Sequence, residues 1–501
     1  MKKFSILLSL LVIAGVFLIS TSCEKLFSTA TGWELNDPDN GGFEYVNYYG
    51  QETGPGLVLV EGGTVTIGRT EQDVMYDWDN VPRRVSVPSF YMDETEITNV
   101  NYREYLYWIQ RVFIDFPEVY RKALPDTLVW RSKLGYNDPY VKYYFRHPAY
   151  QEYPVVGVSW LQATDYAKWR SDRVNEYILI REGLLLKNPN QIGEENFNTE
   201  AYLAGQYEGE MKGSGILDLN PNRDYRKARI EDGIFLPDYR LPTETEWEYA
   251  ALALIGNAYK ERIDDKRIYP WNGHSGLLRN SNPRDMGSFM ANFVRGRGDY
   301  MGVAGALNDN ADITAPVTSY WPNDYGLYCM AGNVSEWVLD VYRPLTFEDF
   351  DEFNPYRGNV FKTKVRDEEG YLAEKDSLGR MRWRPVTDEE AFERDNYNKA
   401  DNINYLDGDY ASSIYYQMED KAASHTTGDM YYAGKSMDGV RGGYNMSSLV
   451  TDRARIYKGG SWKDRAYWLT TGARRYLDES RSRDDLGFRC AMDRVGSPTG
   501  F

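Results

Sequence analysis

Two four-residue patterns fix where helices begin in this chain of 501 residues. The strings Ser159-Trp160-Leu161-Gln162 and Thr243-Glu244-Thr245-Glu246 each place a hydroxyl residue three positions before Gln or Glu. In such a capping box the hydroxyl accepts a hydrogen bond from a backbone N–H of the first helical turn, and the Gln or Glu side chain reaches back to the start. The patterns therefore predict helices over residues 160–174 and 244–254.

The elements before these helices are short. Residues 57–60 form an unbroken apolar run and predict a buried strand, residues 62–63 are glycines and predict a turn, and residues 64–67 predict a second strand. Residues 84–92 alternate in polarity and predict another strand. A helix is expected to begin at Thr98, because apolar residues follow at helical spacing on one face, namely Tyr102, Tyr105, Leu106 and Ile109.

Composition limits the size and the partners of the fold. The length allows one large domain or two to three ordinary ones. The net charge of −17 argues against nucleic acid and anionic lipid as electrostatic partners. The 42 Tyr and 13 Trp residues supply apolar area with polar tips, which is typical of loop-rich chains. Residues 175–235 and 343–450 are polar and are predicted to be two long surface insertions.

The N-terminus has the pattern of a bacterial lipoprotein. Lys2 and Lys3 precede an apolar run over residues 4–19, and Ser20-Thr21-Ser22 then lead to Cys23. We expect a signal peptide over residues 1–22, lipid attachment at Cys23, a tether over residues 23–50 and one domain over residues 51–501. An ordinary signal peptide with an incidental cysteine is the alternative. No second apolar run approaches the roughly 20 residues that span a bilayer.

Eight ordered blocks rich in Gly and Trp run through the chain. They are GGTVTIG (62–68), YMDETEITN (91–99), PVVGVSW (154–160), RLPTETEWE (240–248), YPW (269–271), YGLYCMAGNVSEW (325–337), KGGSW (458–462) and GFRC (487–490). Together they resemble the formylglycine-generating-enzyme (sulfatase-modifying factor) family. The resemblance implies an α+β fold, a variant of the C-type lectin fold with short antiparallel strands, much irregular chain and, here, the two long insertions.

The residue types in these blocks also suggest structural roles. Five tryptophans are predicted to anchor the core, namely Trp160, Trp247, Trp271, Trp337 and Trp462. Four arginines are predicted to form buried ion pairs with Glu244, Glu246 or Glu336, namely Arg240, Arg474, Arg475 and Arg489.

The chemistry that the family uses is missing from the sequence. Its enzymes bind copper and activate oxygen with two cysteines that shortly follow the Gly-Gly-Ser-Trp segment, but residues 461–470 contain no cysteine. Asp464 and Leu469 cannot replace soft thiolates as Cu(I) ligands. Another branch uses histidine-bound iron, whereas the three histidines here, His147, His274 and His425, lie far apart in the sequence. Ser461 has no histidine base nearby. We therefore expect no enzymatic activity.

The two remaining cysteines and the calcium sites of the family leave alternatives open. Cys329 and Cys490 could pair in an oxidising envelope, although sequence does not show that they meet. Calcium prefers oxygen ligands. By resemblance, a first site would use Asn292, the carbonyls of Phe293 and Ala311, and Asp309. A second would use Gly332, Val334 and Glu336, but Cys329 stands where that site normally has Asn or Asp.

Further blocks are not general features of the domain. They are TGPG (53–56), VMYDWDN (74–80), YLYW (105–108), PDTLVW (125–130), HPAY (147–150) and WRSDRVNEY (169–177). They resemble the gliding-motility and type IX secretion lipoproteins. This resemblance implies a non-catalytic outer-membrane lipoprotein that faces the periplasm. Its partners would be a GldK/PorK-like lipoprotein, associated ring or motor proteins and, in addition, peptidoglycan.

Three hypotheses follow from the sequence. The first is a structural and assembly component of the gliding and type IX secretion machinery, with partners docking on the two insertions. The second is a formylglycine-generating-type oxidase, which would need paired thiols near Ser461. The third is a periplasmic module that binds glycan or peptidoglycan, which the fold and the aromatic residues would permit.

Overall fold

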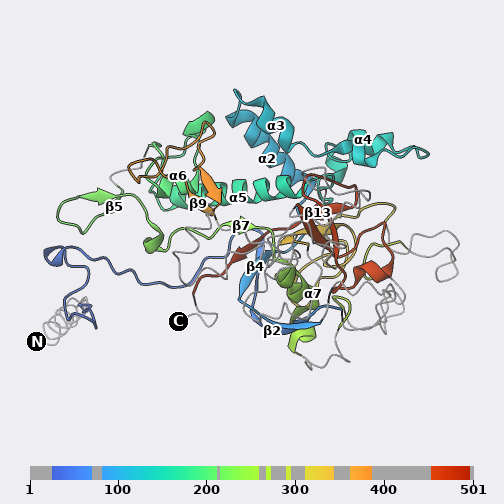
Figure 1. Cartoon of the computed structure of the whole chain (residues 1–501), viewed down its shortest axis with the longest axis horizontal. Helices are drawn as coiled ribbons and strands as arrows, with labels where there is room; N and C mark the ends of the chain where they lie inside the picture. Colours follow the sequence, from blue (N-terminus) through green and yellow to red (C-terminus); the bar gives the residue numbers. More distant parts are fainter. Residues whose placement is uncertain are drawn as a thin grey trace, which may run out of the picture. The chain divides into compact units, whose positions relative to one another are not determined.

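The chain separates into two compact units. The computed structural model describes residues 25–69, 80, 82–210, 215–258, 267–271, 289–294, 311–342, 362–385 and 453–496. Unit 1 comprises Met1–Tyr49, Leu179–Lys187 and Glu210–Phe235, and unit 2 comprises Gly50–Ile178, Asn188–Gly209 and Leu236–Phe501. The first predicted insertion is therefore divided between the two units, with residues 175–178 and 188–209 in unit 2 and the rest in unit 1. Figure 1 shows the course of the chain.

Helices and short strands alternate along the described residues. The helices are α2 (Asn99–Val112), α3 (Pro117–Ala123), α4 (Asp138–Tyr143), α5 (Trp160–Arg181), α6 (Thr199–Leu203) and α7 (Glu244–Ala258). The first seven strands are β1 (Leu57–Val60), β2 (Gly63–Ile67), β3 (Arg83–Val87), β4 (Phe90–Asp93), β5 (Ile216–Leu217), β6 (Tyr225–Arg226) and β7 (Tyr239–Arg240). The others are β8 (Ser335–Val341), β9 (Lys362–Lys364), β10 (Trp383–Pro385), β11 (Ala454–Lys458), β12 (Arg475–Asp478), β13 (Leu486–Phe488) and β14 (Ala491–Asp493).

Both predicted capping boxes are present. The backbone N–H of Ser159 donates to Gln162 Oε1 at 2.8 Å, and the N–H of Gln162 donates to Ser159 Oγ at 3.3 Å. Thr243 and Glu246 exchange the same pair of bonds at 2.9 and 3.2 Å. The helices begin where predicted but run further, because α5 reaches Arg181 and α7 continues to Ala258 past a non-helical residue, Ala253.

The helix predicted from Thr98 is also confirmed. Thr98 caps α2 by accepting a hydrogen bond from the N–H of Asn101 at 3.3 Å. The four residues of the predicted apolar face are all buried, namely Tyr102, Tyr105, Leu106 and Ile109. The ring of Tyr102 stacks on Tyr166 of α5 with centroids 5.6 Å apart, so the apolar face of α2 packs against α5.

The strand predicted over residues 84–92 is wrong in one respect, because it is two strands. Pro88 follows β3, and proline has no N–H with which to continue a ladder. The hydroxyl of Ser89 instead accepts the N–H of Gly62 at 2.9 Å. As a result β3 pairs with β2, whereas β4 pairs with β1 and β14.

Two four-stranded sheets form the centre of unit 2. The first has the order β1-β4-β14-β7 and is antiparallel throughout. The second has the order β12-β11-β8-β13, and its β13 runs parallel to β8, which differs from the antiparallel pairing expected. In Figure 1, α7 lies close to β2 on one side of these strands, and α2, α3 and α4 lie on the other.

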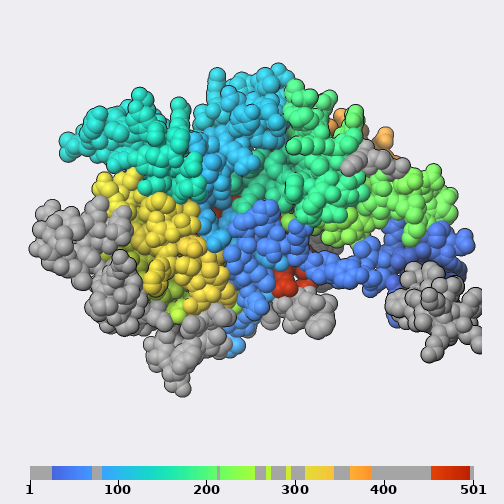
Figure 2. Space-filling view, turned by 180° about the vertical axis from the view of Figure 1, so that it is seen from behind, coloured from blue at the N-terminus to red at the C-terminus, as the bar shows by residue number. Residues whose placement is uncertain are grey.

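The core of unit 2 collects residues from many of the sequence blocks. One cluster joins Trp247 and Leu252 of α7 to Phe90 and Met92 of β4 and to Ile456 of β11. Figure 2 shows residues 311–342 (yellow) directly below the helical segment that contains α4, and the N–H of Val317 donates to the carbonyl of Glu152 at 3.0 Å.

The described parts of the two insertions bind each other within unit 2. The amide of Asn196 donates to the carbonyl of Leu378 at 2.7 Å, and the ammonium of Lys375 donates to the carbonyl of Glu194 at 3.0 Å. The indole N–H of Trp383 donates to Glu200 at 2.8 Å. Residues 362–385 are therefore docked on residues 188–209, although the contacting residues are 181 to 183 positions apart in the sequence.

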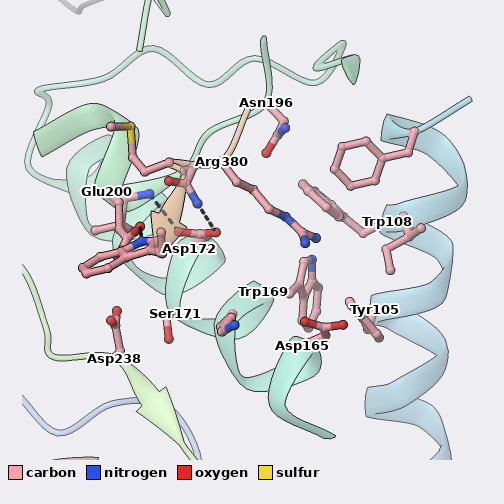
Figure 3. A pocket seen from close by; sticks show the side chains of 17 residues that line it. Tyr105, Trp108, Asp165, Trp169, Ser171, Asp172, Asn196, Glu200, Asp238 and Arg380 are labelled. Carbon is pink, nitrogen blue, oxygen red and sulfur yellow. Dashed lines mark hydrogen bonds between the residues drawn. The ribbon is translucent and has the colours of Figure 1, made fainter. Parts of the chain in front are cut away.

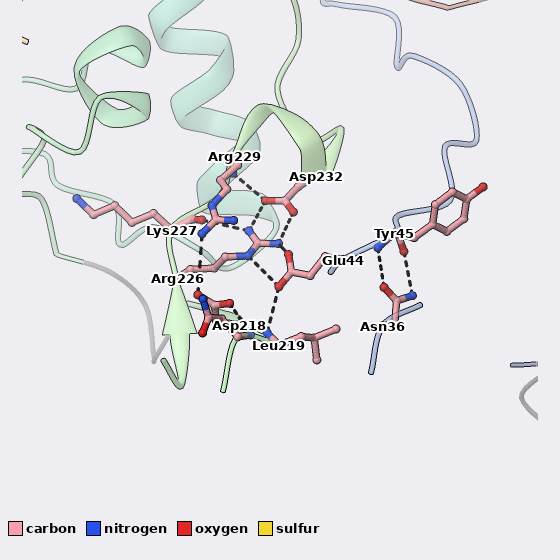
Figure 4. Close-up of polar contacts among 10 residues, drawn as sticks. Asn36, Glu44, Tyr45, Asp218, Leu219, Arg226, Lys227, Arg229 and Asp232 are labelled. Carbon is pink, nitrogen blue, oxygen red and sulfur yellow. Dashed lines mark hydrogen bonds and ion pairs between the residues drawn. The ribbon is translucent and has the colours of Figure 1, made fainter. Parts of the chain in front are cut away.

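Unit 1 is held by an arginine cluster (Figure 4). The guanidinium of Arg226 donates to both oxygens of Asp232 at 2.6 and 2.7 Å and pairs with Glu44. Glu44 also accepts the N–H of Leu219 at 3.1 Å. The hydrogen bonds from Arg226 lower the pKa of Glu44 despite partial burial. The later part of the predicted tether is therefore fixed to residues 218–232.

The fold class is confirmed at the level of mixed helix and sheet. The described residues contain six α-helices together with strands that are at most seven residues long. Within this part of the chain no helix is long and apolar enough to cross a membrane.

Candidate functional site

The loop after β11 is shaped by two glycines. Gly459 and Gly460 have φ angles of +93° and +66°, a region that side chains other than glycine rarely adopt. A Cβ atom on Gly460 would lie 2.8 Å from the carbonyl oxygen of Trp468 and from a methyl of Leu469. The glycines therefore allow this loop to pack closely against the short helix Ala466–Leu469. Ser461 follows directly after them.

Ser461 opens a fully paired polar cluster. Its hydroxyl donates to Asp464 at 2.6 Å and lies 3.1 Å from Asp485. The guanidinium of Arg475 donates to both oxygens of Asp464 at 2.6 and 2.7 Å. Such a bidentate pair has a fixed geometry and is stronger than a single neutral hydrogen bond.

The electrostatics keep Asp464 ionised. Burial acts to raise the pKa of Asp464, but the hydrogen bonds from Arg475 and Ser461 outweigh it, and the pKa is lowered. Leu469, five residues further on, is buried against Tyr269, Ala291 and Phe293. A carboxylate held by arginine and a buried leucine do not fit Cu(I), which prefers soft sulfur ligands.

Glu336 is part of an ion pair in the core. The guanidinium of Arg489 donates to both of its oxygens at 2.6 and 2.7 Å, and the indole N–H of Trp247 donates to Oε2 at 2.8 Å. All three side chains are buried. The carboxylate already accepts hydrogen bonds on both oxygens, so its geometry is that of a structural anchor.

Cys329 lies beside this ion pair and gives no hard oxygen ligand. Its thiol donates to the carbonyl of Val317 at 3.4 Å, and burial raises its pKa well above the ordinary value. Gly332 and Val334 are buried nearby, and the N–H of Val334 donates to Glu96 at 3.2 Å. The second predicted calcium site stays a prediction, and in this arrangement the carboxylate of Glu336 is already paired with Arg489.

The first predicted calcium site is described only in part. The side-chain amide of Asn292 donates to the carbonyl of Ile313 at 2.7 Å, and its backbone carbonyl accepts the N–H of Asn333 at 2.8 Å. Phe293 is buried and Ala311 is half-buried, whereas Asp309 lies outside the described residues. The site stays a prediction. Across the residues that are described, no three His, Cys, Asp or Glu side chains gather as a metal site would require.

The other predicted residues have scattered positions. Cys329 and Cys490 are buried free thiols, so they do not pair. The imidazole of His147 caps a short turn by accepting the N–H of Ala149 at 3.2 Å. The lipid-attachment residue Cys23 lies outside the described residues, as do His274 and His425.

The predicted ion pairs are mostly confirmed. Arg240 pairs with Glu246, Arg474 with Glu244 and Arg489 with Glu336, each within 2.7 Å. Arg475 is the exception, because it pairs with Asp464. One further member was not predicted from the sequence. The fully buried Lys458 pairs with Glu244 at 3.3 Å and with Glu248 at 3.1 Å.

Comparison with known proteins places these features in a family. Residues 43–384 match the family model of the sulfatase-modifying factor enzyme 1-like domain. The chain is 24% identical to the formylglycine-generating enzyme of Mus musculus over 328 residues, 65% of this chain and 68% of the mouse protein. It is 35% identical to that of Thermomonospora curvata over 134 residues, 26% of this chain and 37% of that protein.

A second kind of relative is described as inactive. The chain is 23% identical to the inactive C-alpha-formylglycine-generating enzyme 2 of Mus musculus over 319 residues, 59% of this chain and 72% of that protein. Among solved structures, PvdO from Pseudomonas aeruginosa aligns with 87% of this chain and 94% of its own at 14% identity, with a TM-score of 0.39.

Proposed function

The chain belongs to the sulfatase-modifying factor family, and we propose that it is a non-catalytic member that works as a structural lipoprotein of the cell envelope. The observation that supports this proposal is the cluster of Ser461, Asp464 and Arg475. It occupies the segment in which the family's enzymes carry their cysteine pair, and it leaves neither a thiolate nor an unpaired acid or base there.

The proposal extends to the assembly in which the protein acts. Three of the blocks that resemble the gliding-motility and type IX secretion lipoproteins, the GldJ and GldK (PorK) group, lie together in unit 2, namely residues 53–56, 105–108 and 169–177. Tyr105 contacts Trp169 with ring centroids 5.2 Å apart, the guanidinium of Arg170 donates to the carbonyl of Pro55 at 2.7 Å, and Arg173 lies 4.4 Å over the ring of Trp108.

This arrangement supports a rigid body that presents insertions to partners. We propose that the lipid on Cys23 holds the protein to the outer membrane on its periplasmic face, and that the domain is a C-type-lectin-like variant. Partners of the secretion machinery, including a GldK/PorK-like lipoprotein, dock on the insertions. Bound calcium at Asn292, Asp309 and the carbonyls of Phe293 and Ala311 would be structural.

A genetic test separates this proposal from an unrelated envelope function. Deletion of the gene is expected to abolish both spreading on surfaces and export through the type IX pathway. Wild-type protein and the matched control Ser22→Ala should restore both, because the residue before the cut stays small. Cys23→Ala should restore neither. A deletion strain with normal spreading and normal export would overturn the assignment.

A further inference from the structure

A cavity of about 190 Å³ lies in unit 2 where the two insertions meet α2 and α5 (Figure 3). Five aromatic side chains line it, namely Tyr105, Trp108, Phe113, Trp169 and Trp383. Pockets for drug-sized ligands measure roughly 300–1,000 Å³. We therefore expect this cavity to take one small chemical unit.

Four charged side chains of the cavity make no hydrogen bond or salt bridge to another described residue, namely Asp165, Lys168, Asp238 and Arg380. The indole N–H of Trp169 is buried and also lacks a partner among the described residues. A buried polar group without a partner is unfavourable, so the indole N–H of Trp169 requires a bound molecule or water, whereas the four charged side chains are exposed and hydrated until a ligand replaces that water. The cavity thus offers acceptors and donors that the protein itself does not use.

The signs of these charges alternate along the cavity. At one end, Asp165 and Arg380 both act on Tyr105, since the carboxylate raises the pKa of its hydroxyl and the guanidinium lowers it, while burial dominates. Figure 3 shows both side chains on the side of α2. At the other end, burial and the carboxylates of Asp172 and Glu200 raise the pKa of Asp238 to about 6, and Lys168 opposes this. Among the four charged side chains without a described partner, each end therefore holds one carboxylate and one cation, and the second end also has the hydrogen-bonded carboxylates of Asp172 and Glu200.

This pattern selects among classes of ligand. A cationic ligand would be repelled by Lys168 and Arg380. An anionic ligand would be repelled by Asp165 and Asp238 together with the nearby Asp172 and Glu200. A zwitterion carries its positive and negative charges at separate ends, whereas each end of the cavity carries both signs. Hydroxyl groups each donate and accept hydrogen bonds, so a neutral polyol satisfies both kinds of partner at both ends.

The aromatic walls add a second requirement. Trp383 is held at the rim because its indole N–H donates to Glu200, and 44% of its surface remains exposed. Trp108 is fixed on the opposite wall by Arg173, which lies 4.4 Å over its ring. The aromatic faces pack against apolar surface of the ligand, and the polar side chains at the rim need hydrogen-bond partners. The ligand must therefore have C–H faces as well as hydroxyls. We propose that this cavity binds one neutral saccharide unit, between Trp108 and Trp383.

The proposal is tested with purified full-length protein in detergent. Tryptophan fluorescence is followed during titration with glucose, galactose, mannose and N-acetylglucosamine, and separately with arginine amide and glycylglycine. At least one neutral sugar is expected to give a saturable change in the millimolar range, where binding of one small unit falls. Saturation by arginine amide or glycylglycine alone would overturn the proposal in favour of a cationic or zwitterionic ligand, and no response to any sugar would also overturn it.

Variants locate the binding. Trp383→Ala and Asp165→Asn are each expected to weaken sugar affinity at least tenfold. Asp165→Asn is the variant that keeps the fold, because its exposed carboxylate bonds to no described residue. Trp321→Ala is the matched control, since Trp321 is 61% exposed and does not line the cavity. Sugar binding that both cavity variants leave unchanged would place the site elsewhere and refute the assignment.

Discussion

Two regions of unit 2 differ in whether their charged side chains have partners within the protein. In the core and the loop after β11, Lys458, Arg489 and Arg475 each have a carboxylate within 3.3 Å. In the cavity between the insertions, Asp165 and Arg380 have no such partner among the described residues. Satisfied charges hold a fold together, whereas charges left without a protein partner are available to a ligand. On our proposal, the family framework of this protein is a scaffold, and a recognition surface lies where the insertions meet α2 and α5.

The largest effect is expected where a core pair is broken. Arg489→Met leaves the buried carboxylate of Glu336 without its cation, which costs about 3–5 kcal/mol of unfolding free energy. Urea denaturation followed by circular dichroism measures the loss. Arg453→Met is the control, because Arg453 is exposed where it pairs with Asp478, and such pairs contribute less than about 1 kcal/mol. Equal losses in the two variants would remove the distinction between core and surface pairs.

Acid should weaken the same core. Burial acts to raise the pKa of Glu244, but Arg474 and Lys458 outweigh it and lower the pKa to about 2. The unfolded chain then binds more protons than the folded one below the ordinary value near 4.5. The contribution of Glu244, on the order of 3 kcal/mol, is therefore complete above that pH and disappears as the pH falls toward 2.

Denaturation series at several pH values test this dependence. The variant Glu244→Gln should lose stability at pH 7 and show a flatter decline in acid, whereas Glu61→Gln, at an exposed position, should follow the wild type. A decline in acid that stays equally steep in Glu244→Gln would assign the acid sensitivity to other groups.

The contact between the insertions should have a smaller and local effect. The buried amide of Asn196 bridges the carbonyls of Gly193 and Leu378 at 2.6 and 2.7 Å. Asn196→Ala should cost about 1–2 kcal/mol and speed hydrogen exchange in residues 372–383, while amides of β8 and β11 stay unchanged. Asn188→Ala, at an exposed position, is the control. Faster exchange throughout the core would mean that the stability of the whole fold depends on the contact between the insertions.

The smallest effect is expected in the cavity. Asp165→Asn should change the unfolding free energy by less than about 0.5 kcal/mol, because the carboxylate makes no bond to a described residue. Thermal or urea unfolding of the variant beside the wild type measures this. A loss above 1 kcal/mol would show that Asp165 stabilises the fold rather than serving a ligand.

Local patterns were sufficient to predict much of this structure. Ser159, Thr243 and Thr98 start helices because capping needs only residues three positions apart. The pairs of Arg240, Arg474 and Arg489 followed from charge in or near blocks that resemble the family. Pro88 was a signal for the break between β3 and β4, but the alternation of polar and apolar residues over 84–92 favoured a single strand.

Long-range contacts could not be predicted in the same way. No local pattern joins Asn196 to Leu378 or brings Trp383 to Glu200, because these contacts depend on how two separate insertions return to the same helix pair. The partner of Arg475 was missed for a related reason. Its carboxylate, Asp464, was considered only as a failed copper ligand, whereas the structure uses it as a counter-ion.

The most direct test of the central claim measures chemistry at the loop after β11. Purified protein is incubated with Cu(I), oxygen and a cysteine-containing peptide, and mass spectrometry follows conversion of the cysteine to an aldehyde, with an active formylglycine-generating enzyme as the positive control. The pairing of Asp464 with Arg475 and the burial of Leu469 predict that the peptide stays unmodified. Copper-dependent conversion of the peptide by this protein would contradict the proposal that it is a non-catalytic scaffold.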